Sequence, residues 1–188
     1  MSASSSQTKK TPSVKLQKIT MADYADILKL TSDKEVMKFI GRAITWTPEM
    51  VNSYIQQCMT DEFLSLAERQ YFSFKIVYDN KFAGIIEFKS NNRNIFFRPE
   101  YQKYLKHDVL LTIYLSPQYQ GKGLARKSID LLKRRIRKFK PKAKHLFSIV
   151  RKTNPKMIHV MGKLGFKYLY EIKPQGLAEN FYVFNIEI

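Results

Sequence analysis

The residues best suited to chemistry lie from Leu115 to Ala125, where the sequence LSPQYQGKGLA joins an apolar segment to a basic one. Gly121 and Gly123 lack side chains, so successive backbone N–H groups can turn toward one anion, and the start of a helix adds partial positive charge. The spacing differs from that of the P-loop and of the dinucleotide fingerprint. The pattern predicts a pyrophosphate site, although a tight turn that needs glycine is the commoner reason for a bare G-x-G.

The wider context of this turn resembles the GNAT superfamily of N-acetyltransferases. Gln120 to Ala125 match the acetyl-CoA signature of that family, Q/R-x-x-G-x-G/A. Further along the chain, Asn154 to Phe166 (NPKMIHVMGKLGF) is similar to the second signature, an asparagine followed by a helix and Lys-Leu-Gly-Phe. The segments from Thr31 to Met37 and from Ile40 to Trp46 look like the branch that contains the ribosomal-protein alanine acetyltransferases. The resemblance spans about residues 14 to 188.

The resemblance implies an enzyme that moves the acetyl group of acetyl-CoA to a primary amine by direct attack, without a metal. The amine would belong to a protein N-terminus or to a small molecule, with an anionic acceptor such as a nucleotide-linked amino sugar as one option. The strand over 113–115 would splay from the strand near 147–150 and bind the pantetheine arm along its free edge. The residues implied to bind the cofactor are Ile113, Leu115, Gln120, Gly121, Lys122, Gly123, Leu124, Ala125, Arg126 and Asn154.

The same resemblance suggests where the amine reacts. The backbone N–H of Leu115 would donate to the oxygen that becomes negative when an amine attacks the thioester. Met161 and Leu110 stand where many relatives carry a tyrosine acid and a base, so those roles must move elsewhere or be filled by water. Arg42 and Trp46 lie in the loop that lines the acceptor pocket in relatives, and a core anchor is the alternative role for Trp46.

Two carboxylates on predicted strands are the candidates for proton transfer. Glu87 and Asp108 lie on neighbouring strands, and either could take the proton of the amine directly or through water. A carboxylate on a strand more often faces solvent, which is the alternative for both. Tyr168 and Ser116 are further candidates.

The elements that must position these residues follow from hydrophobic periodicity. Alternating, branched and aromatic residues predict strands over 14–19, 71–78, 82–88, 108–115, 145–150, 165–172 and 180–188, with a hairpin turn at Asp79-Asn80. Helical spacing predicts four helices over 21–30, 47–59, 121–139 and 154–163, and a short helical piece around 34–40 that is not counted separately. Residues 89 to 106 are too long for a hairpin connection and predict an extra strand or an ordered loop. The order βααβββαβαββ predicts an α/β chain with one mixed, mostly antiparallel sheet and helices on both faces, as in the GNAT-like fold.

The charge of the chain is concentrated in one stretch. Its 188 residues include 33 Lys and Arg against 16 Asp and Glu, a formal charge of +17, and residues 126 to 152 contribute twelve basic residues and one acidic residue. Such a patch attracts anions such as nucleic acid, acidic sugars or lipid head groups, although a solvated helix face has the same composition. The alternative function is a basic module that binds nucleic acid or the ribosome through helix 126–140, with an inactive CoA site. A polyamine acceptor is disfavoured by the charge unless a local acidic pocket overrides it.

Composition limits the remaining possibilities. Residues 1–13 are polar and predict a disordered tail, and residues 14–188 predict a single GNAT-like domain. The three histidines are scattered without ligand spacing, so no metal site is expected, and Cys58 predicts buried packing rather than a nucleophile. No apolar run has the length of a spanning helix, so we expect a cytoplasmic protein without a membrane partner, as a monomer or homodimer.

Overall fold

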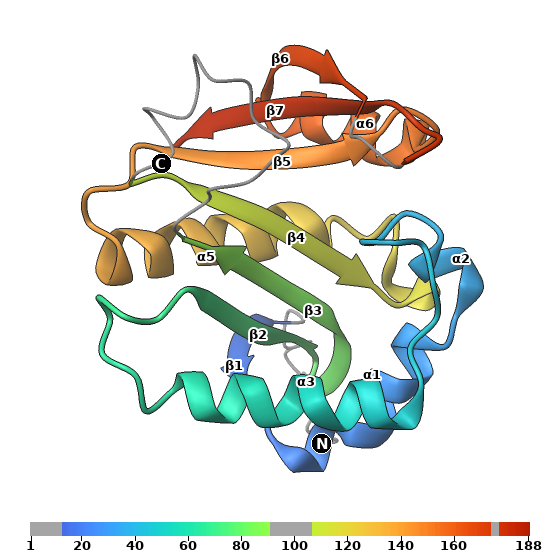
Figure 1. Cartoon of the computed structure of the whole chain (residues 1–188), viewed down its shortest axis with the longest axis vertical. Coiled ribbons are helices and arrows are strands. Elements are labelled where there is room, and N and C mark those ends of the chain that lie inside the picture. The colour runs from blue at the N-terminus through green and yellow to red at the C-terminus, as the bar shows by residue number, and fades with distance from the viewer. Residues whose placement is uncertain (1–12, 91–106, 174–176) are drawn as a thin grey trace, which may run out of the picture.

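The described residues form one seven-stranded sheet with the order β1-β2-β3-β4-β5-β7-β6 (Figure 1). The structure is a computed structural model that describes residues 13–90, 107–173 and 177–188. All neighbouring strands pair antiparallel except β4 and β5, which run parallel, so the predicted mixed, mostly antiparallel sheet is confirmed. The strands are β1 (Val14–Lys18), β2 (Tyr71–Tyr78), β3 (Lys81–Lys89), β4 (Val109–Leu115), β5 (His145–Arg151), β6 (Lys167–Ile172) and β7 (Phe181–Glu187).

Helices cover both faces of the sheet, as predicted (Figure 1). On one face, α1, α2 and α3 pack on the sheet around Ile27, Val51 and Ile85. On the other face, α5 and α6 bury Leu132 and Met161 against it. The helical segments are η1 (Met21–Asp23), α1 (Tyr24–Thr31), α2 (Lys34–Met37), α3 (Pro48–Asp61), η2 (Pro117–Tyr119), α5 (Leu124–Phe139) and α6 (Pro155–Lys163).

Local chemistry explains how α3 begins and how β2 turns into β3. The Thr47 hydroxyl accepts from the backbone N–H of Met50 at 3.3 Å, and Pro48 occupies the first helical position, where its missing N–H is not needed. Asp79 and Asn80 have positive φ angles of 50° and 59°, the conformation of a tight hairpin turn that Asp and Asn tolerate. The predicted hairpin is therefore confirmed.

Two predicted boundaries move because of glycines in the left-handed region. Helix α5 begins at Leu124 rather than at residue 121, because Gly121 and Gly123 have φ angles of 73° and 72° and cannot be part of a right-handed helix. Strand β6 begins at Lys167 rather than at residue 165, because Gly165, with φ of 83°, ends the preceding helix. The helical piece predicted around 34–40 is also shorter in the structure, where α2 ends at Met37.

Some predictions fall on residues that the structure does not describe. The extra strand or ordered loop predicted over 89–106 lies outside the described residues from position 91 onward, and the tail predicted over 1–13 lies outside them up to position 12. Within the ranges described, no helix is long and apolar enough to cross a membrane.

Candidate active site

The parallel strands β4 and β5 diverge toward their C-terminal ends (Figure 1). Their pairing runs from Val109 with Leu146 to Leu111 with Ser148 and stops there, although both strands continue. Beyond that point β4 pairs only with β3, and β5 pairs only with β7. The two strands therefore present unpaired edges to each other, and an extended ligand can hydrogen-bond to such edges.

The free edge of β4 displays the backbone groups of Ile113 and Leu115. The Ser116 N–H donates to the Ala83 carbonyl oxygen on β3 at 3.0 Å, and successive backbone groups of a strand point to opposite edges. The N–H groups of Leu115 and Ile113 therefore point away from β3, toward β5. The Leu115 carbonyl accepts from the Gln120 side chain at 3.1 Å, so its N–H is the group that remains for a ligand.

The turn between β4 and α5 presents backbone amides around two glycines. A Cβ atom built on Gly121 or Gly123 would meet no atom within 4 Å, so space is open beside both residues. The Lys127 N–H donates to the Gly123 carbonyl oxygen at 3.3 Å, and the amides of residues 124–126 precede the first bond of this helix. Free amides and the helix dipole together make this turn an anion site.

Polar side chains surround the turn. Lys122 is exposed, and its ammonium lies 5.7 Å from the centre of the Tyr119 ring. Arg126 donates to the carbonyl oxygen of Lys163 at 2.5 Å and so joins the start of α5 to the end of α6. The Asn154 side-chain oxygen accepts a backbone N–H in the first turn of α6, which leaves its Nδ2 group as a donor.

Comparison with known proteins identifies the family of this chain. Residues 13–167 match the family model of the Acetyltransferase (GNAT) domain. The chain belongs to the GNAT acetyltransferase family. It is 29% identical over 160 residues to the spermidine N(1)-acetyltransferase of Escherichia coli K12, which covers 82% of this chain and 73% of that protein.

Solved structures share the GNAT fold over nearly the whole chain. A spermidine N-acetyltransferase from Vibrio cholerae, in complex with CoA and spermine, matches with a TM-score of 0.68 and 16% identity over 93% of this chain and 95% of that chain. A ribosomal L7/L12 alpha-N-protein acetyltransferase in complex with CoA matches with a TM-score of 0.72 and 13% identity over 93% and 94%. The family and fold indicated by the two sequence signatures are confirmed.

As a GNAT protein, the chain is an acetyl-CoA-dependent N-acetyltransferase. The residues present fit that cosubstrate, because the free amides at the start of α5 suit a diphosphate and the open edge of β4 suits an arm that contains amides. Acetyl-CoA supplies a thioester whose acetyl group an amine can attack. The contacts assigned to Ile113, Leu115, 120–126 and Asn154 remain predictions.

Glu87 lies at the centre of a hydrogen-bond cluster on the α3 face of the sheet. Its Oε1 accepts from the hydroxyls of Tyr54 on α3, at 2.6 Å, and of Ser73 on β2, at 2.8 Å, and its Oε2 accepts from Tyr114 on β4 at 3.0 Å. Each carboxylate oxygen has two lone pairs, so Oε2 keeps one acceptor position. Glu87 pairs across the sheet with Thr112, the residue after the last β4 position paired with β5, so β4 separates Glu87 from the open edge.

The two phenols of this cluster are held as neutral donors. Burial raises the pKa of Tyr54 and of Tyr114 well above the usual value of 10.0, and the negative charge of Glu87 raises it further. Both hydroxyls therefore stay protonated at neutral pH. Burial also raises the pKa of the neighbouring Cys58 thiol to about 11, so this cysteine is a neutral packing residue, in line with its sequence interpretation.

Asp108 lies far from this cluster. It directly precedes β4, and Leu115 is seven positions further along the chain, a distance of roughly 23 Å along a strand. The buried Asp108 carboxylate accepts the backbone N–H groups of Lys144 and His145 at 2.9 Å each, and its second oxygen lies 3.1 Å from the His145 ring. These contacts give Asp108 a structural role in joining β4 to the start of β5.

The exchange of Asp108 for asparagine tests that role. We expect Asp108→Asn to lower the free energy of unfolding by about 1–3 kcal/mol, because a buried acceptor of two backbone amides loses its charge. We expect kcat to stay within about twofold of the wild type, since the change lies far from the reacting groups. Urea unfolding and initial rates measure the two effects. A large loss of kcat with unchanged stability would instead make Asp108 part of the chemistry.

The predicted acceptor loop joins the cluster through Trp46. The Trp46 ring centre lies 5.1 Å from that of Tyr54. The backbone N–H of Trp46 donates to the Thr31 carbonyl oxygen at 3.0 Å. Trp46 therefore anchors the loop and also lies one side chain away from Glu87. Arg42 is exposed in the same loop and has no hydrogen-bond or ion-pair partner among the residues described, so the structure does not connect it to the cluster.

The other positions considered from sequence lie apart from the cluster. Met161 is fully buried in the core under α5, and Leu110 packs with Phe147 near the paired half of β4. Tyr168 is 54% exposed on β6, the edge strand of the sheet, where it contacts other aromatic rings. Ser116 directly follows β4 and is half-buried beside the turn.

No group of three His, Cys, Asp or Glu within the described ranges is arranged to hold a metal ion.

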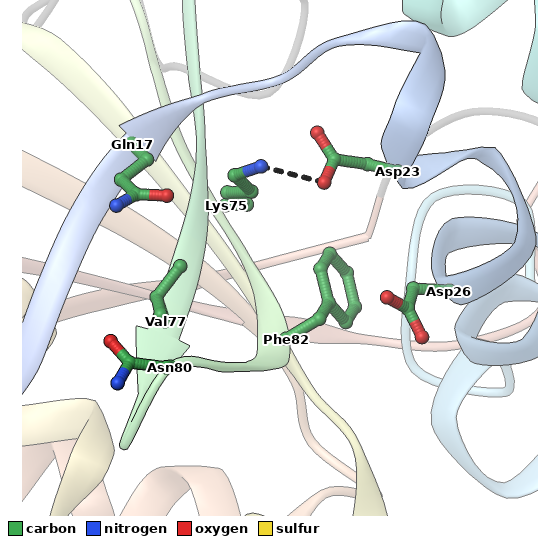
Figure 2. Close-up of a pocket in the computed structure, with 7 residues that line it drawn as sticks. All are labelled: Gln17, Asp23, Asp26, Lys75, Val77, Asn80 and Phe82. Carbon is green, nitrogen blue, oxygen red and sulfur yellow. Dashed lines mark hydrogen bonds and ion pairs between the residues drawn. The ribbon is translucent and has the colours of Figure 1, made fainter.

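A pocket of about 210 Å³ lies over β1 to β3, away from the open edges of β4 and β5 (Figure 2). Figure 2 shows Asp23, Asp26 and Lys75 around it. Asp23 pairs with Lys75 at 2.7 Å and also accepts the Thr20 N–H at 2.8 Å, so its carboxylate is used within the fold. This pocket is therefore separate from the candidate active site.

Sequence reasoning missed the residues that surround Glu87 and the one that holds the acceptor loop. Glu87 is the one charged residue of the predicted strand over 82–88, and Ser73 is one of two polar residues, with Lys75, in the otherwise apolar and aromatic segment 71–78; these exceptions were the available signal. Arg151, at the end of β5, is 5% exposed, donates to the Gly41 carbonyl oxygen at 2.8 Å and pairs with Glu179 at 3.1 Å. Arg151 thus joins the loop over 41–47 to the segment before β7, and no local sequence pattern predicts this contact.

Proposed function

We propose that the protein acetylates a primary amine of a small polycationic acceptor of the polyamine class. The observation that carries this proposal is Glu87, a carboxylate on β3 that accepts from Tyr114 of β4 and has one acceptor position left on Oε2. An alkylammonium group donates to such a position and is attracted by its charge. Binding of the amine that reacts therefore rests on a charged hydrogen bond to Glu87.

The local charge supports a cationic acceptor despite the total of +17. The segment 20–62, which forms α1 to α3 and the acceptor loop, contains seven acidic and four basic residues and is net negative by three. The basic stretch 126–152 begins with α5, which packs on the opposite face of the sheet. Salt screens charges over about 8 Å at physiological ionic strength, so the near face governs the approach of a small cation.

Aromatic side chains beside Glu87 also favour a cationic amine. Trp46 and Tyr54 lie in contact, and Tyr54 donates to the carboxylate. A cation over an aromatic face is attracted by the ring quadrupole, by about 0.5–2 kcal/mol. The carboxylate contacts Tyr54, and Trp46 lies on the other side of that ring, so the aromatic surroundings are suited to an ammonium group.

The proposed chemistry is direct attack of the amine on the acetyl group. Glu87 binds the attacking nitrogen and takes its proton, directly or through one water molecule. As the C–N bond forms, the C–S bond of the thioester breaks, and CoA leaves as a thiolate that takes a proton from water. The backbone N–H of Leu115 donates to the acetyl oxygen as negative charge develops there. Tyr54 and Tyr114 hold the carboxylate in place throughout, because both remain protonated donors.

Relatives lend support to the acceptor class. The curated relative that is 29% identical over 160 residues is a spermidine N(1)-acetyltransferase. A structure with the same fold contains spermine together with CoA. Polyamines are primary amines with additional positive charge, which agrees with the local electrostatics above.

An acetylation assay on a panel of amines tests the proposal. Release of free CoA thiol is followed with spermidine, spermine, an aminoglycoside, an amino sugar, a nucleotide-linked amino sugar and an alanine-terminated peptide. We expect kcat/KM for the polyamines to exceed that for every other amine by at least about tenfold, or about 1.4 kcal/mol, because the net negative segment 20–62 attracts their additional ammonium groups. A preference for the peptide or for the anionic sugar would overturn the proposed acceptor while leaving the acetyltransferase activity intact.

A further inference from the structure

The outer face of α5 carries an unbalanced row of cations. Leu132 and the neighbouring apolar side chains of this 16-residue helix are buried against the sheet. The opposite side carries Lys127, Lys133, Arg134, Arg137 and Lys138, of which Lys133 is half-buried and the others are exposed. None of these five forms an ion pair with a residue that the structure describes. The acetyltransferase site does not use them.

The spacing of these cations is unfavourable for an isolated solvated face. Lys133 and Arg137 are four positions apart, as are Arg134 and Lys138, so each pair places like charges on adjacent turns. Asp130 is the one acidic residue in this helix, and although it lies three or four positions from Lys127, Lys133 and Arg134, one carboxylate offsets only part of their charge. A helix that needed only solubility would alternate charges of both signs. The arrangement instead matches a partner with regularly spaced negative charges.

We propose that this face of α5 binds the phosphate backbone of duplex nucleic acid without reading its sequence. The helix is roughly 24 Å long, enough to follow several phosphates of one strand. Arg134 and Arg137 suit phosphate in particular, because the guanidinium group donates two parallel hydrogen bonds to it. Sequence-independent binding of this kind depends on charge, which the face supplies.

Other polyanionic partners fit this face less well. A bilayer surface requires apolar side chains that insert among the lipids, and none of the exposed large hydrophobic residues described lies in α5. A single strand is bound through aromatic stacking, and the outer face offers no exposed aromatic ring. A duplex requires only cations at helical spacing. The face lies across the sheet from the acceptor side, so bound nucleic acid would leave the proposed acceptor site open (Figure 1).

Fluorescence anisotropy with labelled RNA and DNA duplexes of about 20 base pairs tests the proposal. If five phosphates are neutralised, the affinity should fall roughly 500-fold between about 50 and 200 mM KCl, a slope of about −4.5 in logarithms. Arg134→Gln with Lys138→Gln should weaken binding at low salt by at least about tenfold and reduce the slope to about −2.7. These side chains are exposed, and circular dichroism checks that the variant is folded.

The matched control has the same change of charge on the other face of the sheet. Lys29→Gln with Lys34→Gln should leave the affinity within about twofold of the wild type. Equal losses in the two variants would overturn the proposal, since only the total charge would then matter. So would binding to phosphatidylserine vesicles without binding to either duplex. Saturating acetyl-CoA should leave duplex affinity unchanged, and competition would place the nucleic acid on the turn over 120–125 instead.

Discussion

Replacing Gly123 by glutamate is expected to weaken acetyl-CoA binding by at least about 100-fold, or about 2.7 kcal/mol, while the protein stays folded. The φ angle of Gly123 is 72°, and the space beside it is open. The new side chain therefore enters the space in which we expect the diphosphate to bind. Its carboxylate repels that anion and takes up the free amides of the turn. Isothermal titration with acetyl-CoA measures the loss.

The control for this variant is Gly123→Ala, which also places a Cβ atom at a left-handed φ angle but adds no charge. A side chain at this left-handed position should lower the free energy of unfolding by about 1 kcal/mol in both variants. The alanine variant should lose less than about tenfold in affinity, because the amides stay free. Equal losses in the two variants would mean that backbone strain, rather than a displaced anion, explains the effect. Unchanged affinity in the glutamate variant would move the diphosphate to another place.

Replacing Glu87 by glutamine is expected to lower kcat by about 10²–10⁴-fold for every amine that the enzyme accepts. Glutamine keeps the size of the side chain, and its amide oxygen still accepts from Tyr54 and Ser73, but its amide nitrogen cannot accept from Tyr114. The amide also neither takes the proton nor attracts the ammonium group. Because the proposed role concerns the reacting nitrogen, the loss should be as large for a simple monoamine as for spermidine. Initial rates of thiol release, measured with both amines, test this.

Two variants serve as controls for Glu87. Asp108→Asn is the same chemical change beside the adjacent strand and should leave kcat nearly unchanged. Tyr54→Phe removes one of the three donors but keeps the carboxylate, so a loss of about tenfold or less is expected. If Glu87→Gln raised KM for spermidine alone, the carboxylate would anchor a distant ammonium group instead of the reacting one. If kcat were unaffected, Glu87 would be a structural residue and the proton acceptor would lie elsewhere.

The contrast between Glu87 and Asp108 shows what sequence could not decide. Both are single carboxylates at or beside strands rich in apolar residues. The direction of β4 separates them, because its C-terminal end meets the glycine turn and its N-terminal end meets the start of β5. Strand direction within a sheet depends on pairing with distant segments, and a single sequence does not contain that pairing in readable form.

The surroundings of Glu87 depend on an irregularity in a hairpin. A regular hairpin closed at Asp79 and Asn80 would place Phe72 opposite Glu87. The register shift at Ile76 and Val77 places Ser73 there instead. Gly84 belongs to the same region, and a Cβ at that position would lie 2.1 Å from the Tyr114 carbonyl oxygen. Hairpin existence was predictable from the turn residues, but a single extra residue changes which side chains share a face.

The sequence by itself determined the elements, the family and the position of the glycine turn before α5. Helical and strand periodicity are local properties, and the glycines at 121 and 123 indicate a left-handed backbone conformation that only a few residue types adopt. The tertiary structure alone decided how Tyr54, Ser73 and Tyr114, from three different elements, meet at one carboxylate. It also decided that the sheet separates the basic helix α5 from α1 to α3, whose segment 20–62 is net negative. These features arise from contacts between segments far apart in the chain, which packing of the whole domain brings together.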